Sequence, residues 1–169
     1  MSTVIAGGLR ERLIADSIHL YLKRALSLLG WFNPDPGRRD VHYMPRPAGD
    51  DEPIELNTVG VFSDRVRDTD LELGSLLAES AWQWYADIYG EDEAVGMHLS
   101  GDVRDILRGK MPTVGASAPV IPVLDFRLAT PVEIFYVEIQ DVVRDRPPSY
   151  THPWQQFWMP VPFTVVDSA

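Results

Sequence analysis

The chain has 169 residues, a net charge of −10 and no cysteine. This length fits a single domain, residues 1–169, that can bury a core of its own. The absence of cysteine excludes disulfides, thiol catalysis and thiolate-bound zinc. The acidic balance argues against tight binding to DNA, because affinity for the phosphate backbone comes mainly from Lys and Arg.

No apolar run approaches the roughly 18 residues that a membrane span needs. The opening segment, MSTVIAGGLRERL, has neither the basic region nor the long apolar core of a signal peptide. We therefore expect a protein that is made in the cytoplasm and has no membrane partner.

The clearest helix is GLRERLIADSIHLYLKRALSLLG, residues 8–30. Its apolar residues recur at helical spacing, and Gly30 is placed to cap the C-terminal end. The predicted buried stripe consists of Ile14, Ile18, Tyr21, Ala25 and Leu28, with Leu22 and Leu29 beside it. Such a helix must pack its apolar face on another element, most simply a sheet.

Three stretches have no regular pattern. Residues 33–53 form a Pro/Gly-rich loop that is long for a compact domain. Residues 64–80 read as a loop or hairpin arm, and the small-residue stretch 111–119 reads as a loop. We expect the loops 33–53 and 111–119 to be the most mobile segments of an isolated subunit.

Two strands are predicted between the first helix and the second. Residues 53–64 read as a strand whose phase shifts near Asn57, which suggests a bulge or a register change. In AWQWYADIYG, residues 81–90, apolar and polar side chains alternate cleanly and aromatic residues are frequent. Since aromatics favour strands, we predict a strand here rather than a helix.

The second predicted helix spans residues 91–110. Acidic residues at its start and basic residues at its end complement the helix dipole. Its predicted buried stripe is Val95, Leu99, Val103, Ile106 and Leu107, whereas Gly96 and Gly101 weaken it.

Three further strands follow, at residues 120–128, 131–145 and 154–167. In the middle one, Phe135, Val137, Ile139 and Val143 share one face, and Ile134 and Tyr136 share the other, so its start is predicted to be covered on both faces. The order α-β-β-α-β-β-β predicts an α+β fold with a mostly antiparallel sheet.

The last strand, WQQFWMPVPFTVV, carries the candidate site. Alternation places Phe157, Met159, Val161, Phe163 and Val165 on a core face, and Trp154, Trp158, Pro160, Pro162 and Thr164 on the other. Both prolines remove donors along one side of the strand, which predicts an edge strand. Protection of a strand edge against further pairing is by itself a sufficient explanation for the prolines. The two tryptophans should be covered either by the first helix or by another subunit. We favour a subunit interface formed by Trp154, Trp158, Pro160 and Pro162, because aromatics are enriched at interfaces.

No constellation for catalysis is recognisable. The sequence has no phosphate-binding loop, no nucleophile elbow and only scattered histidines. His98, Asp102 and Asp105 lie one turn apart on the second helix, but acids along a helix usually form a solvated face. We predict no enzyme activity, no metal and no cofactor.

Three stretches together resemble the tail terminator (head–tail joining) family of long-tailed phages that infect actinobacteria. They are WQWYADIYGEDEAVGMHLSGDVRDIL, PVEIFYVEIQDVVRDR and HPWQQFWMPVPFTVVD. The lambda-type terminators are similar in plan: an N-terminal helix, a strand pair with an aromatic second member, a helix, then further strands. The similarity covers residues 9–30 and 54–167, and the loop at 33–53 has no counterpart.

This resemblance implies a structural virion protein in the tail neck, assembled in the host cytoplasm. Such proteins form a homohexameric ring that stops growth of the tail tube. Their partners are the major tail tube protein, the head–tail connector or stopper, and genomic DNA that passes through the lumen without specific binding. The alternatives are another neck protein, such as a stopper or adaptor, a minor tail protein, or a small-molecule binding domain or enzyme.

Overall fold

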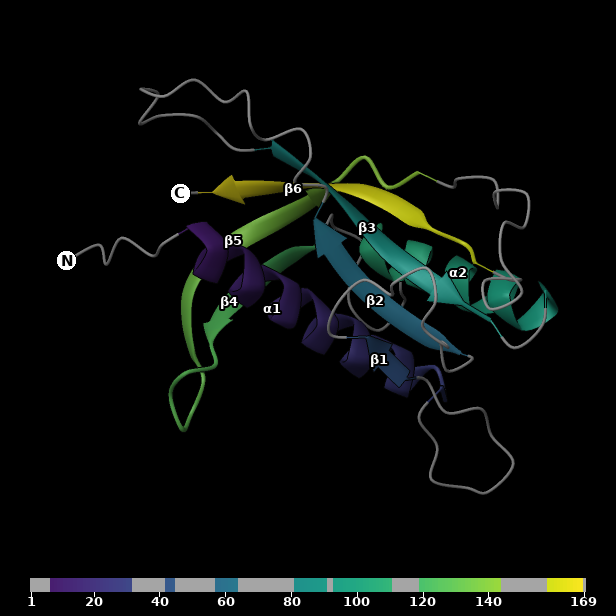
Figure 1. Ribbon diagram of the computed structural model, residues 1–169, viewed down its shortest axis with the longest axis horizontal. Helices are drawn as coiled ribbons and strands as arrows, with labels where there is room; N and C mark the ends of the chain where they lie inside the picture. Colours follow the sequence, from purple (N-terminus) through teal and green to yellow (C-terminus); the bar gives the residue numbers. More distant parts are fainter. Residues whose placement is uncertain are drawn as a thin grey trace.

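A six-stranded sheet with two helices against it forms the fold in the computed structural model (Figure 1). The structure describes residues 7–31, 42–44, 57–63, 81–90, 93–110, 119–143 and 158–168. In chain order the elements are α1 (Gly7–Leu28), β1 (His42–Met44), β2 (Thr58–Ser63), β3 (Ala81–Tyr89), α2 (Glu93–Leu107), β4 (Val120–Asp125), β5 (Val132–Gln140) and β6 (Val161–Ser168).

The predicted α+β class is confirmed. The sheet order is β1-β2-β3-β6-β5-β4, and every pairing except the parallel one between β1 and β2 is antiparallel. β1 is an addition to the predicted order, because it lies inside the stretch 33–53 that was predicted to be a loop. The rest of that loop, and the loops predicted at 64–80 and 111–118, lie outside the described residues.

Both helices end in the same way. After α1, Gly30 has a φ of 87° and donates to the Ser27 carbonyl at 3.0 Å, while the Trp31 N–H reaches the Leu26 carbonyl at 3.1 Å. After α2, Gly109 repeats this geometry with a φ of 67°. These are Schellman caps, which need a left-handed residue that glycine adopts without strain. The predicted cap at Gly30 is therefore confirmed.

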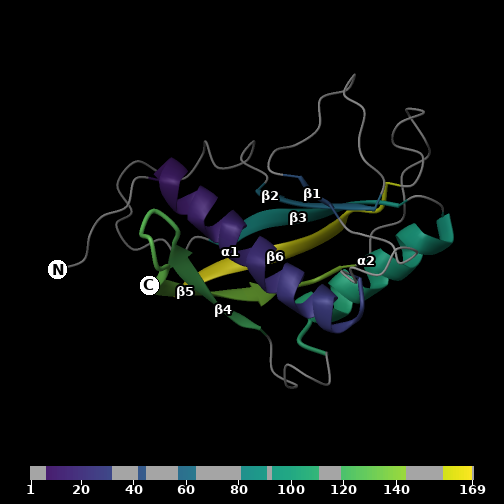
Figure 2. The same ribbon diagram turned by 90° about the horizontal axis from the view of Figure 1, so that it is seen from below.

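The core lies between the sheet and the two helices. Figure 2 shows the sheet curling, with α1 lying between β2 and β4, and α1 contacts both of these strands. The predicted stripe of α2 is confirmed, since all five of its residues are buried. The sheet contributes the residues Val59, Val61, Trp84, Ala86, Ile88, Ile121, Val123, Val137, Ile139, Val161, Phe163 and Val165.

The predicted stripe of α1 is partly wrong at its C-terminal end. Leu13 and Leu26 are buried, whereas Leu28 is 68% exposed and Leu29 is 42% exposed. The buried face of α1 ends with Ala25 and Leu26, and the chain turns at Gly30 directly after the helix, which leaves Leu28 and Leu29 exposed.

Two predictions for β5 are wrong. Its start is not covered on both faces, because Ile134 is 40% exposed and Tyr136 is 45% exposed. β5 also ends at Gln140, so that Val143 is exposed rather than in the core. The chain leaves the strand at Asp141, whose φ of 50° breaks the extended conformation.

The prediction that the last strand is an edge strand is also wrong. β6 lies in the middle of the sheet, between β3 and β5. Its core face is confirmed for Met159, Val161, Phe163 and Val165, while Phe157 lies outside the described residues.

The edge strands of the described sheet are β1 and β4, and β4 pairs with β5 alone. Pro119 accepts from the Ile139 N–H at 3.2 Å, so the even-numbered residues of β4 point their N–H groups away from β5. Pro122 has no N–H group on that outer side, and the Leu124 N–H is bound by Ser17. The outer side of β4 is therefore poorly suited to pairing with a further strand.

Candidate functional site

The predicted aromatic site lies where the chain enters β6. Trp158 forms an isolated antiparallel bridge with Tyr89 at the end of β3, and Pro162 pairs with Tyr85. Pro160 is buried, whereas Trp158 and Pro162 are half-buried. Trp154 lies outside the described residues. The structure thus brings three of the four predicted residues together on one short stretch.

The prolines stand where the ladder to β5 is interrupted. Pairing between β5 and β6 begins at Thr164 and Gln140. On the same side of β6, Pro162 accepts from the Val143 N–H at 3.0 Å. The N–H and C=O groups of one strand residue point the same way, so the missing N–H of Pro162 also faces β5. Both prolines thus lack a donor on the same side of β6, as deduced from the sequence. That side faces the end of β5 rather than an open edge.

Trp158 has partners within its own chain. Its ring stacks on Tyr89, with ring centroids 6.5 Å apart and an interplanar angle of 14°. Its indole Nε1–H donates to Asp87 Oδ1 at 3.1 Å. Met159, the next residue, is buried and contacts Ser100 of α2, so alternation places Trp158 on the sheet face away from the helices. Helix α1 does not cover this tryptophan.

The surroundings of Trp158 are electrostatically unusual. Burial raises the pKa of the Asp87 carboxyl, and the hydrogen bond from Trp158 opposes that shift. Burial and the nearby Asp87 charge raise the pKa of Tyr89 well above its ordinary value. The cluster joins one carboxyl group to two aromatic rings, and the indole donor already occupies one oxygen of that carboxyl group.

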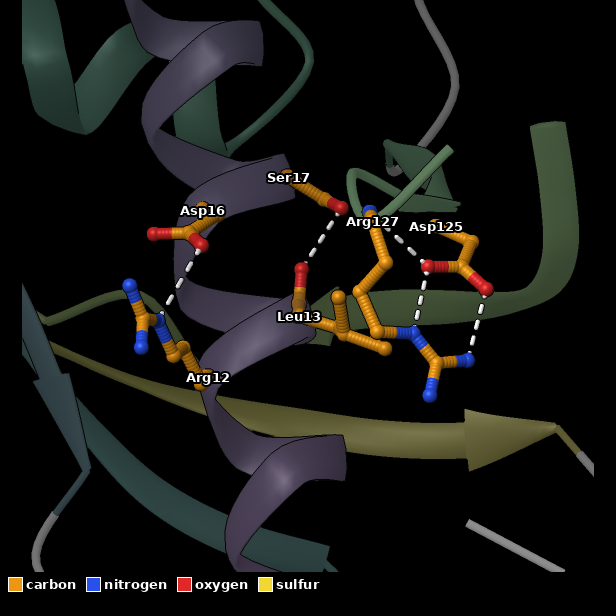
Figure 3. Close-up of polar contacts among 6 residues, drawn as sticks. All are labelled: Arg12, Leu13, Asp16, Ser17, Asp125 and Arg127. Atoms are coloured by element: carbon orange, nitrogen blue, oxygen red, sulfur yellow. Dashed lines mark hydrogen bonds and ion pairs between the residues drawn. The ribbon is translucent and has the colours of Figure 1, made fainter. Parts of the chain in front are cut away.

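A second pair of polar side chains, on α1, was not singled out as functional from the sequence. The Ser17 hydroxyl donates to the Leu13 carbonyl at 2.7 Å (Figure 3) and accepts from the Leu124 N–H at 3.0 Å. His19 Nε2 accepts from the Val61 N–H at 3.0 Å. Burial lowers the pKa of His19 to about 4, so the ring stays neutral and can accept. These two residues attach α1 to β4 and to β2.

Of the two acids that were predicted to form a solvated face of α2, Asp102 instead makes packing contacts, whereas Asp105 is half-exposed. Asp102 Oδ2 accepts from the Trp31 indole at 2.8 Å and lies 3.4 Å from His98 Nε2. Trp31 packs edge-on against the His98 ring at a centroid distance of 5.1 Å. Within the described ranges, no group of three His, Cys, Asp or Glu side chains is arranged to hold a metal ion. The paired-arginine stretch GRRD, residues 37–40, reads from the sequence as a solvated loop rather than a contact with DNA or a partner, and it lies outside those ranges.

The turn between β4 and β5 is fixed by an ion pair. Arg127 binds Asp125 through two parallel hydrogen bonds, Nε to Oδ1 at 2.8 Å and Nη2 to Oδ2 at 2.6 Å (Figure 3). Bidentate pairs of this kind add geometric specificity. Between β4 and β5 the register shifts so that Ile134 has no partner on β4, which marks a bulge. The hairpin therefore has a defined shape despite its exposure.

Comparison with known proteins does not identify a family for this chain. No protein-family model matches this chain, and a search of curated proteins gives no match either. In the described part of the chain, no helix combines the length and the apolar character of a membrane span.

Proposed function

We propose that this chain is a tail terminator of a long-tailed phage. In this role it is a structural virion protein without enzymatic activity. It closes the head-proximal end of the tail tube as a hexameric ring, stops tube growth and presents the surface on which the head connector docks. Its place is the neck of the virion, and it assembles in the host cytoplasm.

The observation that carries the proposal is the order of the elements. A long N-terminal helix, the antiparallel pair β2 and β3 with its aromatic second member, a helix, and three further strands make up the chain. This is the plan that the resemblance of the sequence to the terminators implies, with the short β1 added.

The use of the buried polar groups is consistent with a structural role. Ser17, His19 and Asp87 each hold a hydrogen bond that joins two elements of the fold. An active site would place such groups together at a concave surface, where they could reach a substrate. Here they are distributed over α1 and β3 and serve packing.

The acidic composition suits a ring through which DNA travels. A net charge of −10 gives no basis for holding phosphates, so DNA can slide through without being retained. The proposed partners are therefore further copies of this chain, the major tail tube protein and the head connector or stopper.

The proposal is tested with the purified protein and tail tubes assembled from the tube protein of the same phage. Imaging and mass measurement should show a six-membered ring. Added to growing tubes, the protein should bind one end and stop elongation. Binding to the portal side instead, with tube growth unaffected, would identify a head–tail stopper and refute the terminator proposal.

A further inference from the structure

The β4–β5 hairpin carries an exposed apolar surface. Five large apolar side chains on it are between 40% and 56% exposed. These side chains, called here the hairpin patch, are Val120, Leu128, Val132, Ile134 and Tyr136; Val120 and Tyr136 lie on the sheet face away from the helices, whereas Val132 pairs with Asp125 on the other face. Apolar side chains that gather on one hairpin mark an interaction site more readily than the same number scattered singly.

The end of α1 carries a second exposed apolar surface. Leu28 is the most exposed large apolar side chain described, at 68%, and Leu29 follows it at 42%. Lys23 and Arg24 are exposed one turn before them. This helix-end patch therefore combines Leu28 and Leu29 with Lys23 and Arg24.

The two patches are complementary in charge. Next to the hairpin patch lie Glu133, which accepts from the Tyr136 hydroxyl at 2.7 Å, and Glu138, which pairs with Val120. The Arg127–Asp125 pair in the turn is neutral as a unit. On the sheet face away from the helices, the hairpin thus presents apolar side chains with acidic neighbours, since Arg10 lies over Phe135 on the other face. The helix end presents apolar side chains with basic neighbours.

The patches also lie far apart on the molecule. Figures 1 and 2 both place the β4–β5 hairpin toward the end of the long axis opposite the C-terminal end of α1. One copy cannot bring its own patches together, whereas the hairpin patch of one copy can meet the helix-end patch of another. Since the outer side of β4 is blocked by Pro122 and Ser17, this contact is made by side chains and not by strand addition.

We propose that the hairpin patch of one copy packs against the helix-end patch of the next copy, head to tail. Such a contact joins two different surfaces, and it closes into a ring when the rotation between neighbours allows closure. The inference deepens the proposed function, on which the closed ring rests, by naming the surfaces that form the subunit contact.

Charge reversal on each patch tests the contact. One variant carries Lys23→Glu and Arg24→Glu, and the other carries Glu133→Lys and Glu138→Lys. Each variant presents like charges on both of its patches, so we expect its apparent dissociation constant for assembly to rise about tenfold or more. In a 1:1 mixture, the acidic helix end of the first variant meets the basic hairpin of the second. The unchanged acidic hairpin of the first meets the unchanged basic helix end of the second. Alternating assemblies should therefore form, with the mass of the wild-type particle.

Arg12→Glu serves as the control, because it reverses an exposed charge on α1 outside both patches. It should assemble like the wild type, and circular dichroism should show all variants folded. Assembly of either double variant alone at wild-type concentrations would overturn the proposed contact. So would a mixture that stays unassembled, or a wild-type protein that stays monomeric at every concentration.

The tube-capping assay separates this inference from the proposed function. If tube ends are still capped while the charge variants assemble normally, the contact uses other surfaces and the terminator role stands. If capping fails while the variants behave as expected, the contact is correct and the terminator role is wrong.

Discussion

At the scale of single residues, α1 is joined to the sheet through two acceptors that lie two positions apart. Ser17 binds the Leu124 N–H at the bulged edge of β4, and His19 binds the Val61 N–H of β2. Each N–H group lies at a point where its strand has no backbone partner for it. A buried donor without a partner is costly, so these side chains complete the hydrogen bonding of the curled sheet.

Replacing Ser17 with alanine should destabilise the fold. The substitution leaves the Leu124 N–H without its acceptor beneath α1, which should lower the free energy of unfolding by about 1–3 kcal/mol. Ser27→Ala is the matched control, since Ser27 is exposed on the same helix, and alanine there should be neutral or slightly stabilising. Urea unfolding of both variants measures the difference. Equal stabilities of the two variants would show that the Ser17 hydrogen bond contributes nothing.

His19 should make the protein sensitive to acid. Burial lowers the pKa of its imidazole from 6.5 to about 4, so the unfolded chain takes up a proton at a higher pH than the folded chain does. The stability that the neutral ring provides is complete above about pH 6.5. It is lost progressively as the pH falls toward 4, by a total of about 3 kcal/mol.

The contribution of His19 to the pH dependence of stability can be isolated with the variant His19→Gln. Glutamine offers an acceptor for the Val61 N–H at a similar reach and does not titrate. Subtracting its unfolding free energy from that of the wild type at each pH should give a difference that varies between pH 6.5 and 4. A constant difference over that range would mean that His19 is not the acid-sensitive group.

At the scale of elements, sequence patterns predicted best where the signal is local. The stripe of α2 and the strand character of β3 depend on periodicity within one segment, and both are confirmed. The place of β6 in the sheet is not local. The prolines of β6 indicate that donors are missing on one side of the strand. No residue of β6 indicates that β3 lies on the other side.

The same limit explains the errors at β5 and at the candidate site. The apolar pair Ile134 and Tyr136 would lie on a covered face only if another element packed over it. In the structure both side chains are exposed. Likewise, Trp158 is paired with Asp87 and Tyr89 across about 70 residues of chain, and only the register of β3 against the entry to β6 brings them together.

Two glycines of the α2 region should respond to alanine in opposite directions. A methyl group at Gly101 would meet nothing within 4 Å, so Gly101→Ala should raise the free energy of unfolding by about 0.5–1 kcal/mol. Gly109 has a φ of 67° in the cap, so Gly109→Ala should destabilise by about 1 kcal/mol. Thermal unfolding of the two variants checks the signs. A destabilising Gly101→Ala would mean that the apparent space is filled in solution.

At the scale of the whole molecule, the arrangement is one-sided. Both helices pack on one face of the sheet, while the face that bears Tyr85, Pro162 and Tyr136 has no helix over it within the described residues. The proposed ring would need surfaces beyond the core of each subunit, and the uncovered sheet face is available for such a contact. The predicted interface role of Trp158 belongs to this face and stays a prediction.

Trp158→Ala should act on both the monomer and the assembly. In the monomer it removes the stacking on Tyr89 and the donor to Asp87, which should lower the free energy of unfolding by about 1–3 kcal/mol while the core stays intact. In the assembly it removes an aromatic surface, which should raise the dissociation constant for ring formation about tenfold or more. Unfolding is measured below the concentration of assembly, and ring formation by sedimentation.

Trp158→Phe separates the two roles of this side chain. Phenylalanine keeps a ring that can stack on Tyr89 and contact a neighbour, but it has no Nε1–H for Asp87. It should therefore lose about 1 kcal/mol of stability and assemble nearly as well as the wild type. If Trp158→Ala destabilises the monomer but leaves assembly unchanged at every concentration, the tryptophan acts only within its own chain. The surface around Trp158 is then not part of a subunit contact, and this result leaves the hairpin patch untested.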